Sequence, residues 1–264
     1  MIENADALVL NRIEFSETSL IVSLFTRQFG KIDGLAKGGR RLKSSFESAL
    51  DTLAHISVTF LQKKSDSLDL LTESKLIRRF SVTENNLAGL YAGYYVAELV
   101  QRLTEKSDPL PKLFDVTVST LRQLEQGQFV MRTITRFESQ LLRHIGEQPS
   151  FLQCVSCGKS LVAEYDDEKN HRIGFSHQEG GVLCRECREN VKPLIFVTKE
   201  TMKCLSIFAD PNEDDEHWKT MPMTKNIKGE IRSLQQNYLC HRIGYRPKLF
   251  DWLGFIAKND VESQ

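Results

Sequence analysis

Short apolar segments with alternating polar positions fill the first third of the chain. Five of them are rich in Val, Ile, Leu, Phe and Thr, and polar or glycine-bearing turns separate them. So many strands in so short a stretch favour a small closed β-barrel of the OB-fold type over a sandwich. The insertion at 40–50 predicts a loop and a helical turn. The predicted strands are residues 7–15, 18–26, 30–39, 53–62 and 68–77.

From residue 84 to 146 the apolar residues follow a helical period instead. The helical period resumes after Thr198. Apolar side chains recur there at spacings of three and four residues. Asp108 and Pro109 predict the N-cap and first position of one helix, and Gly146 predicts the end of the next. The apolar faces are marked by Leu87, Leu90, Tyr91 and Tyr94, by Ile134, Phe137, Leu141 and Ile145, by Met202, Leu205 and Phe208, and by Ile227, Ile231, Leu234, Tyr238 and Leu239.

These patterns predict an α+β multidomain chain with three parts. An N-terminal OB-fold β-barrel is expected at 1–80. An α-helical domain follows, formed by 81–150 and 191–264. A zinc-binding module with four cysteines is inserted into it at 151–190.

Four of the six cysteines form two Cys-X-X-Cys pairs. A two-residue gap lets both thiolates of a pair face one tetrahedral ion, and two pairs complete a shell with no open position. A short hairpin is expected between them, from 172–175 and 180–183. We therefore predict one structural Zn²⁺ per chain, and the closed shell argues against zinc catalysis. The predicted ligands are Cys154, Cys157, Cys184 and Cys187.

Other interpretations of the cysteines remain open. A Cys-X-X-Cys pair can be a redox dithiol or a disulfide, although no βαβ pattern accompanies these two, or the cysteines can be vestigial. His171 and His177 lie between the pairs and are alternative ligands, but we expect them to face solvent. Cys204 and Cys240 lie on helical faces, and we expect both to be buried thiols.

The chain of 264 residues carries 35 basic and 35 acidic residues, so its net charge is zero. A dedicated chromatin binder would be strongly basic, so any affinity for nucleic acid has to come from local clustering. Basic residues do cluster at 31–43, where Asp33 is the one acid, and 210–216 is the acidic counterpart. The predicted nucleic-acid-binding residues are Lys31, Lys37, Arg40, Arg41 and Lys43.

The glycines beside these bases raise the alternative of a nucleotide-binding P-loop. That motif needs a glycine before Lys43, and the chain has Leu42 there. A cationic turn on a barrel rim can instead follow a polynucleotide backbone while exposed aromatic rings stack on bases. Phe46 is a candidate ring, although an apolar residue that enters a helix more often belongs to the core. A solvated loop is the alternative for the basic residues.

Composition and motifs also set expectations about the class of protein. No catalytic motif is present and the six histidines are scattered, so we expect no enzymatic activity and no small-molecule substrate. No apolar run approaches the roughly 20 residues of a membrane span. The first ten residues carry acids where a secretory signal has bases, so we expect a cytoplasmic protein without a membrane partner.

Short motifs along nearly the whole chain resemble, in the expected order, the RecO family of recombination mediators. They include both cysteine pairs with Gly180 and Gly181 before the second. The chain departs from the family at 247–249, where members often have Lys-Ser. The other motifs are residues 7–12, 15–20, 24–26, 29–32, 36–41, 95–99, 136–138, 141–142, Gly146, Pro149 and 241–248.

The resemblance implies an OB domain, a helical domain with a zinc module, and a nucleoid-associated protein. It implies binding to single- and double-stranded DNA, annealing of complementary strands, and complex formation with RecR. It also implies the loading of a RecA-type recombinase onto strands covered by single-stranded DNA-binding protein (SSB). The alternatives are a zinc-stabilised protein-interaction adaptor with incidental basic charge and a hydrolase whose site is assembled across domains.

Overall fold

The computed structural model describes residues 1–41, 44–46, 49–63, 67–162, 172–210, 215–250 and 252. The chain forms two compact units. The first unit comprises Met1–Thr133 and Trp252, and the second unit comprises Ile134–Phe250. The domain limits expected from the sequence remain a prediction.

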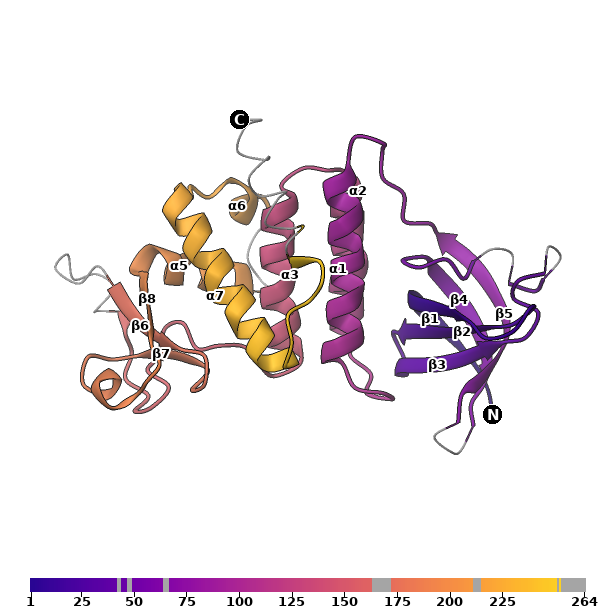
Figure 1. Cartoon of the computed structure of the whole chain (residues 1–264), viewed down its shortest axis with the longest axis horizontal. Coiled ribbons are helices and arrows are strands. Elements are labelled where there is room, and N and C mark those ends of the chain that lie inside the picture. The colour runs from indigo at the N-terminus through magenta and orange to yellow at the C-terminus, as the bar shows by residue number, and fades with distance from the viewer. Residues whose placement is uncertain are drawn as a thin grey trace. The chain divides into compact units, whose positions relative to one another are not determined.

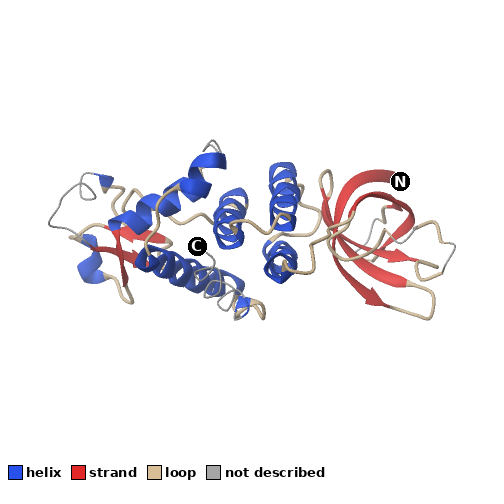
Figure 2. Ribbon diagram, turned by 90° about the horizontal axis from the view of Figure 1, so that it is seen from above, coloured by secondary structure: helices blue, strands red, loops and turns tan. Residues whose placement is uncertain are grey.

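The first unit contains the predicted five-stranded barrel (Figures 1 and 2). Its strand order is β1-β2-β3-β5-β4, and β1 pairs with β4 to close it. The β3–β5 pair is parallel and the other pairs are antiparallel, which confirms the OB-type fold. The strands are β1 (Ile2–Glu14), β2 (Leu20–Thr26), β3 (Gly30–Ala36), β4 (His55–Leu61) and β5 (Asp69–Arg78).

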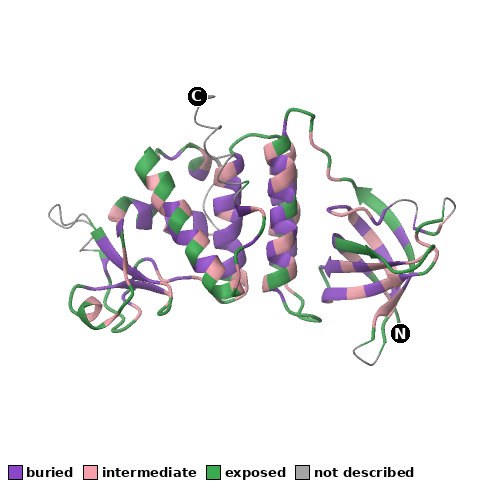
Figure 3. Ribbon diagram, in the orientation of Figure 1, coloured by how far each residue is buried: buried purple, intermediate pink, exposed green. Residues whose placement is uncertain are grey.

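Alternation of side chains explains why these segments become barrel strands. On β4, Ile56, Val58 and Phe60 are fully buried while the residues between them are half-buried. Figure 3 shows buried positions recurring along the barrel strands. Gly34 on β3 allows close packing, because an added Cβ would lie 2.4 Å from the Leu71 side chain.

Two helices of the first unit follow the barrel, α1 (Leu87–Leu103) and α2 (Pro111–Glu125). The prediction of Asp108 and Pro109 as the start of α2 is wrong. The helix begins at Pro111 because a residue before proline is driven out of the helical region, and Leu110 at the N-cap makes no side-chain cap.

The second unit combines helices with a small sheet of order β7-β6-β8. The expected hairpin is present as β6 (Arg172–Ser176) and β7 (Gly181–Leu183), and a 3₁₀ turn (Cys187–Asn190) follows it. The sequence did not predict the third strand, β8 (Ile195–Thr198), which pairs with β6. The helices are α3 (Val130–His144), which begins in the first unit, α5 (Lys199–Ala209), α6 (Asp215–Thr220) and α7 (Lys225–Ile243).

Two predicted features fall partly outside the described residues. Residues 42–43 and 47–48 of the insertion after β3 lie outside them, and the described part forms a turn at 45–46. Of the acidic stretch 210–216, residues 211–214 also lie outside them. No helix in the described ranges combines the length and the apolar character needed to cross a membrane.

Candidate metal centre and nucleic-acid interface

The structure brings the four predicted cysteine ligands together. Their Sγ atoms all lie within 4.8 Å of one another, and the Sγ atoms of Cys157 and Cys184 are 3.8 Å apart. A tetrahedral Zn²⁺ with bonds of about 2.3 Å separates its sulfur ligands by about 3.8 Å. The cluster therefore has the donor type and spacing for a four-coordinate metal ion.

Backbone hydrogen bonds hold the first cysteine pair in place. The Gly158 amide donates to the Cys154 carbonyl at 2.8 Å, and the Cys154 amide donates to the Lys159 carbonyl at 2.9 Å. Gly158 has φ +73°, a conformation that glycine adopts without a Cβ penalty. The Val155 amide donates to the Val182 carbonyl on β7 at 3.0 Å, which joins the first pair to the strand that leads into the second.

The thiols differ in how easily they ionise. Burial opposes ionisation of Cys154, but backbone amides of Cys184, Cys157 and Ser156 together lower its pKa to about 6. Hydrogen bonding to Ser156 favours the Cys187 thiolate, but the thiols of Cys184 and Cys157 outweigh it and raise the pKa of Cys187 to about 12. A divalent cation supplies the positive charge that four neighbouring thiolates require.

Among the described residues, His177 does not join the cluster. His177 is half-buried, with its ring 5.3 Å from that of Phe175 and 6.2 Å from that of Tyr238, so the expectation that it faces solvent is wrong. His171 lies outside the described residues. Cys204 is buried as predicted, whereas Cys240 is only half-buried.

A turn at 37–41, which we call the basic turn, carries three of the predicted nucleic-acid-binding residues on the barrel rim. The Lys37, Arg40 and Arg41 side chains are all exposed. The Arg41 amide donates to the Gly38 carbonyl at 3.0 Å, and Gly38 has φ +74°. The turn is therefore closed by its own backbone, and its charged side chains extend from a fixed loop.

The basic turn lies against the turn that joins β1 and β2. The Arg40 amide donates to the Thr18 carbonyl at 3.1 Å, and the Arg40 guanidinium donates to the Ser16 carbonyl at 3.3 Å. Arg40 also pairs with Glu14 at 3.1 Å. Within the described part of the chain, Lys37 and Arg41 have no ion pair, so their charges are available to a polyanion. Lys43 lies outside the described residues.

Lys31 has a different environment from the other predicted bases. Its residue is 8 % exposed, and its Nζ donates to the carbonyls of Gln101 at 2.6 Å and Thr104 at 2.5 Å. Burial lowers its pKa, although the nearby Asp33 carboxylate acts in the opposite direction. Lys31 therefore joins β3 to the end of α1, and almost none of the residue is exposed to a polyanion.

Two phenylalanines that flank barrel strands in the sequence differ in exposure. Phe46 is 2 % exposed and belongs to the barrel core, so its candidacy as a stacking ring fails. Phe15, directly after β1, is 61 % exposed. Sequence reasoning missed it because it was assigned to the end of a strand, where a phenylalanine is usually buried.

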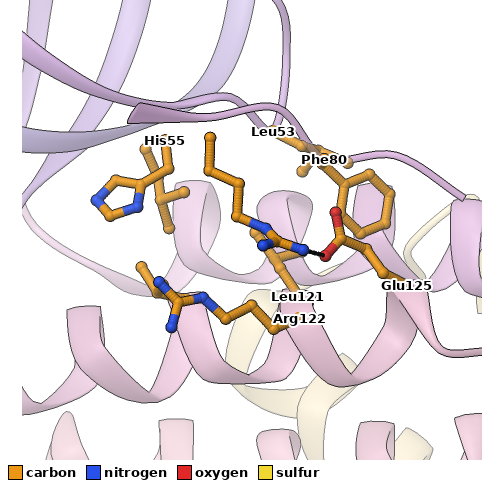
Figure 4. Close-up of a pocket in the computed structure, with 9 residues that line it drawn as sticks. Leu53, His55, Phe80, Leu121, Arg122 and Glu125 are labelled. Atoms are coloured by element: carbon orange, nitrogen blue, oxygen red, sulfur yellow. Dashed lines mark hydrogen bonds and ion pairs between the residues drawn. The ribbon is translucent and has the colours of Figure 1, made fainter. Parts of the chain in front are cut away.

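A small pocket of the first unit lies between the barrel and α2 (Figure 4). Leu53, Phe80 and Leu121 give it apolar walls, and an ion pair between Arg78 and Glu125 lies at its edge. Its volume of about 20 Å³ is room for roughly one water molecule. The pocket is therefore a packing gap and not a binding site for a metabolite.

Two family descriptions match the chain. "Recombination protein O N terminal" matches residues 1–80, which contain the barrel and the basic turn. "Recombination protein O C terminal" matches residues 84–249, which contain the cysteine cluster. Together they cover most of the chain.

Curated relatives agree with these matches. A protein of Rhodopirellula baltica named DNA repair protein RecO is 40% identical over 207 residues, which are 78% of this chain and 75% of the relative. A protein of the same name from Halalkalibacterium halodurans is 27% identical over 238 residues, covering 90% of this chain and 89% of the relative. One from Myxococcus xanthus is 25% identical over 252 residues, covering 96% and 97%.

Proposed function

Because the chain belongs to the recombination protein O (RecO) family, we propose that it is a recombination mediator of DNA repair. It binds single- and double-stranded DNA and anneals complementary strands. With RecR, it helps to load a RecA-type recombinase onto single strands covered by SSB. It does this as a cytoplasmic, nucleoid-associated protein and without catalysing a covalent step.

The observation that carries this proposal is the exposed basic turn on the rim of an OB barrel. Lys37 and Arg41 have no ion pair among the described residues, and Arg40 has one weak, exposed pair with Glu14. Cationic side chains on a fixed loop displace counterions from phosphates, which favours polynucleotide binding at low salt.

Annealing follows from the same charges. Two complementary strands repel each other through their phosphates, and this repulsion slows the encounter of their bases. A turn with several cations reduces that repulsion while both strands are bound to it, and base pairing then proceeds without nucleotide hydrolysis.

In this proposal the cysteine cluster holds zinc. Cys154, Cys157, Cys184 and Cys187 complete a shell of four thiolates, and a zinc ion there supplies cross-linking of the two pairs and no reactive water. The metal stabilises the fold around β6 and β7. The DNA contacts lie in the first unit and do not involve it.

A salt titration tests DNA binding at the basic turn. Alanine at Lys37, Arg40 and Arg41 is expected to weaken binding to a labelled oligonucleotide. The slope of log affinity against log salt concentration is expected to become less negative by about two. A matched control replaces three exposed lysines of the second unit, Lys192, Lys225 and Lys228. Equal slopes for the two triple variants would favour the adaptor with incidental charge.

Annealing needs a second assay. Fluorescent complementary strands are mixed with and without SSB and RecR, and the rate of duplex formation is followed. We expect the chain to accelerate annealing and the basic-turn variant to lose most of that acceleration. An unchanged rate in the variant would contradict the mechanism above.

A further inference from the structure

We propose that Phe15 stacks on an unpaired base of a single strand whose phosphates contact the basic turn. This inference rests on the proposed function, because it adds a base-contacting residue to the same interface. It assigns to the protein a preference for strands with accessible bases.

The exposure of Phe15 has no explanation in the folding of the barrel. Phe25, Phe46 and Phe60 of the barrel are at most 2 % exposed, whereas Phe15 is 61 % exposed. A large apolar ring in water contributes little to stability, and exposed aromatic rings are common where a protein contacts another molecule.

The ring is attached to a well-ordered turn. The Phe15 amide donates to the Ser19 carbonyl at 3.0 Å, and the Ser16 amide donates to the same carbonyl at 3.3 Å. These bonds close the β1–β2 turn directly after the last strand pair, Glu14 with Leu20. A stacking ring on a fixed turn loses little conformational entropy when a base binds.

The same turn contacts the basic turn. Arg40 donates to the Thr18 carbonyl from its amide and to the Ser16 carbonyl from its guanidinium. Ile13, two residues before Phe15 on the extended chain, is 57 % exposed and extends the apolar surface. The turn that carries Phe15 and the basic turn are thus in direct contact through Arg40, and a nucleotide likewise carries a base close to a phosphate.

This chemistry selects single strands. The bases of a duplex are stacked on each other and cannot meet a protein ring without being unstacked, whereas each base of a single strand has a free face. Phosphate contacts at the basic turn serve both forms. Loss of the Phe15 ring is therefore expected to affect single strands alone.

The test compares Phe15→Ala, Phe15→Leu and Phe15→Trp on three probes of equal length, namely a single strand, a duplex and a single strand of abasic sites. We expect Ala and Leu to lose about tenfold in affinity for the single strand, since a stacked base contributes about 1–3 kcal/mol. Trp retains the affinity. Duplex and abasic probes bind all variants alike.

Tyr94→Ala on α1 is the matched control, because Tyr94 is another exposed ring of the first unit, 43 % exposed. It is expected to leave all three affinities unchanged, and thermal unfolding confirms that each variant is folded. The proposal is overturned if the Ala and Leu variants keep single-strand affinity. It is also overturned if these variants bind all three probes more weakly by the same factor. That pattern would indicate that the β1–β2 turn only supports the basic side chains of the basic turn.

These failures are distinguishable from failure of the proposed function. If DNA binding is wrong as a whole, the basic-turn triple variant matches its lysine control on every probe. If only stacking is wrong, the triple variant loses affinity and the Phe15 variants do not.

Discussion

The Nζ atom of Lys31 donates a hydrogen bond to the Thr104 carbonyl, 2.5 Å away at the end of α1. Lys31→Met removes this donor and leaves the buried Thr104 carbonyl and the partly buried Gln101 carbonyl without it. We expect a loss of about 1–3 kcal/mol in the free energy of unfolding. Thermal or chemical unfolding measures it, and the salt dependence of DNA binding is expected to stay unchanged. A flatter salt slope with intact stability would instead place Lys31 on a phosphate.

Glu14 limits the charge that the basic turn presents, because it pairs with Arg40 at 3.1 Å. Glu14→Gln is expected to raise DNA affinity by up to about fivefold at low salt and by less at high salt, since exposed pairs are weak and screened. Glu73→Gln, an exposed glutamate of β5, is the control. Equal effects of the two substitutions would show a change in overall charge only.

Glu230 on α7 connects three elements of the second unit. It accepts hydrogen bonds from the Thr198 amide at 2.8 Å and from the Thr198 and Thr201 hydroxyls at 2.7 Å, and it pairs with Arg172 at 3.5 Å. Burial acts to raise the pKa of Glu230, but these contacts lower it below the ordinary value of 4.5.

A carboxyl whose pKa is lowered on folding stabilises the fold at pH values above its ordinary pKa. This contribution is lost as the pH falls through the pKa of the folded state. Glu230→Gln is therefore expected to cost about 2 kcal/mol at neutral pH, and its deficit relative to wild type should shrink below about pH 4.5. Unfolding of both proteins between pH 3 and 7 checks this. A deficit independent of pH would show that the carboxylate charge is irrelevant.

Metal removal tests the cysteine cluster. We expect one Zn²⁺ per chain, and we expect a chelator to lower the thermal midpoint and make four thiols reactive. Cys184→Ser is expected to give the same midpoint with or without chelator, since a three-thiolate site holds the ion poorly. Cys240→Ser, outside the cluster, should keep the full metal content. An unchanged midpoint after chelation would contradict a structural metal.

Gly30 packs against the chain before α2. Its φ is +67°, and an added Cβ would lie 2.2 Å from the Asp108 carbonyl oxygen. Gly30→Ala is expected to destabilise the protein by about 2–4 kcal/mol. Gly229→Ala on α7 should stabilise the protein by up to about 1 kcal/mol. Alanine favours a helix more than glycine does, and nothing lies within 4 Å of the added Cβ. Two changes of the same sign would contradict this interpretation.

The sequence predicted the barrel because alternation on its strands is set by the core, as at Ile56, Val58 and Phe60. It predicted the cysteine cluster because ligand spacing is local. It did not predict the role of Lys31, since the partners of that side chain are carbonyls about 70 residues away. The strand β8 was missed for a related reason: a four-residue strand carries little pattern, and pairing with β6 decides its conformation.

The same limit applies to β1. Its predicted start at residue 7 was late, because Ile2 and its neighbours lack an apolar run, and pairing of Ile2 with Leu61 extends the strand. Phe46 is in the core and Phe15 is exposed, and the pattern around each residue does not distinguish them, because exposure depends on which loop folds over the barrel. Local patterns thus identify secondary-structure elements and metal ligands. Contacts between distant parts of the chain decide which residues are exposed.

Closure of the barrel through β1 and β4 has a consequence for recognition. Where the described strands pair on both sides, a visiting peptide finds no free edge at which to add a sixth strand. A partner that approaches those parts of the barrel therefore contacts side chains and loop ends. The charge and shape of the loops can therefore be altered by substitution while the hydrogen-bonded ring beneath them stays the same.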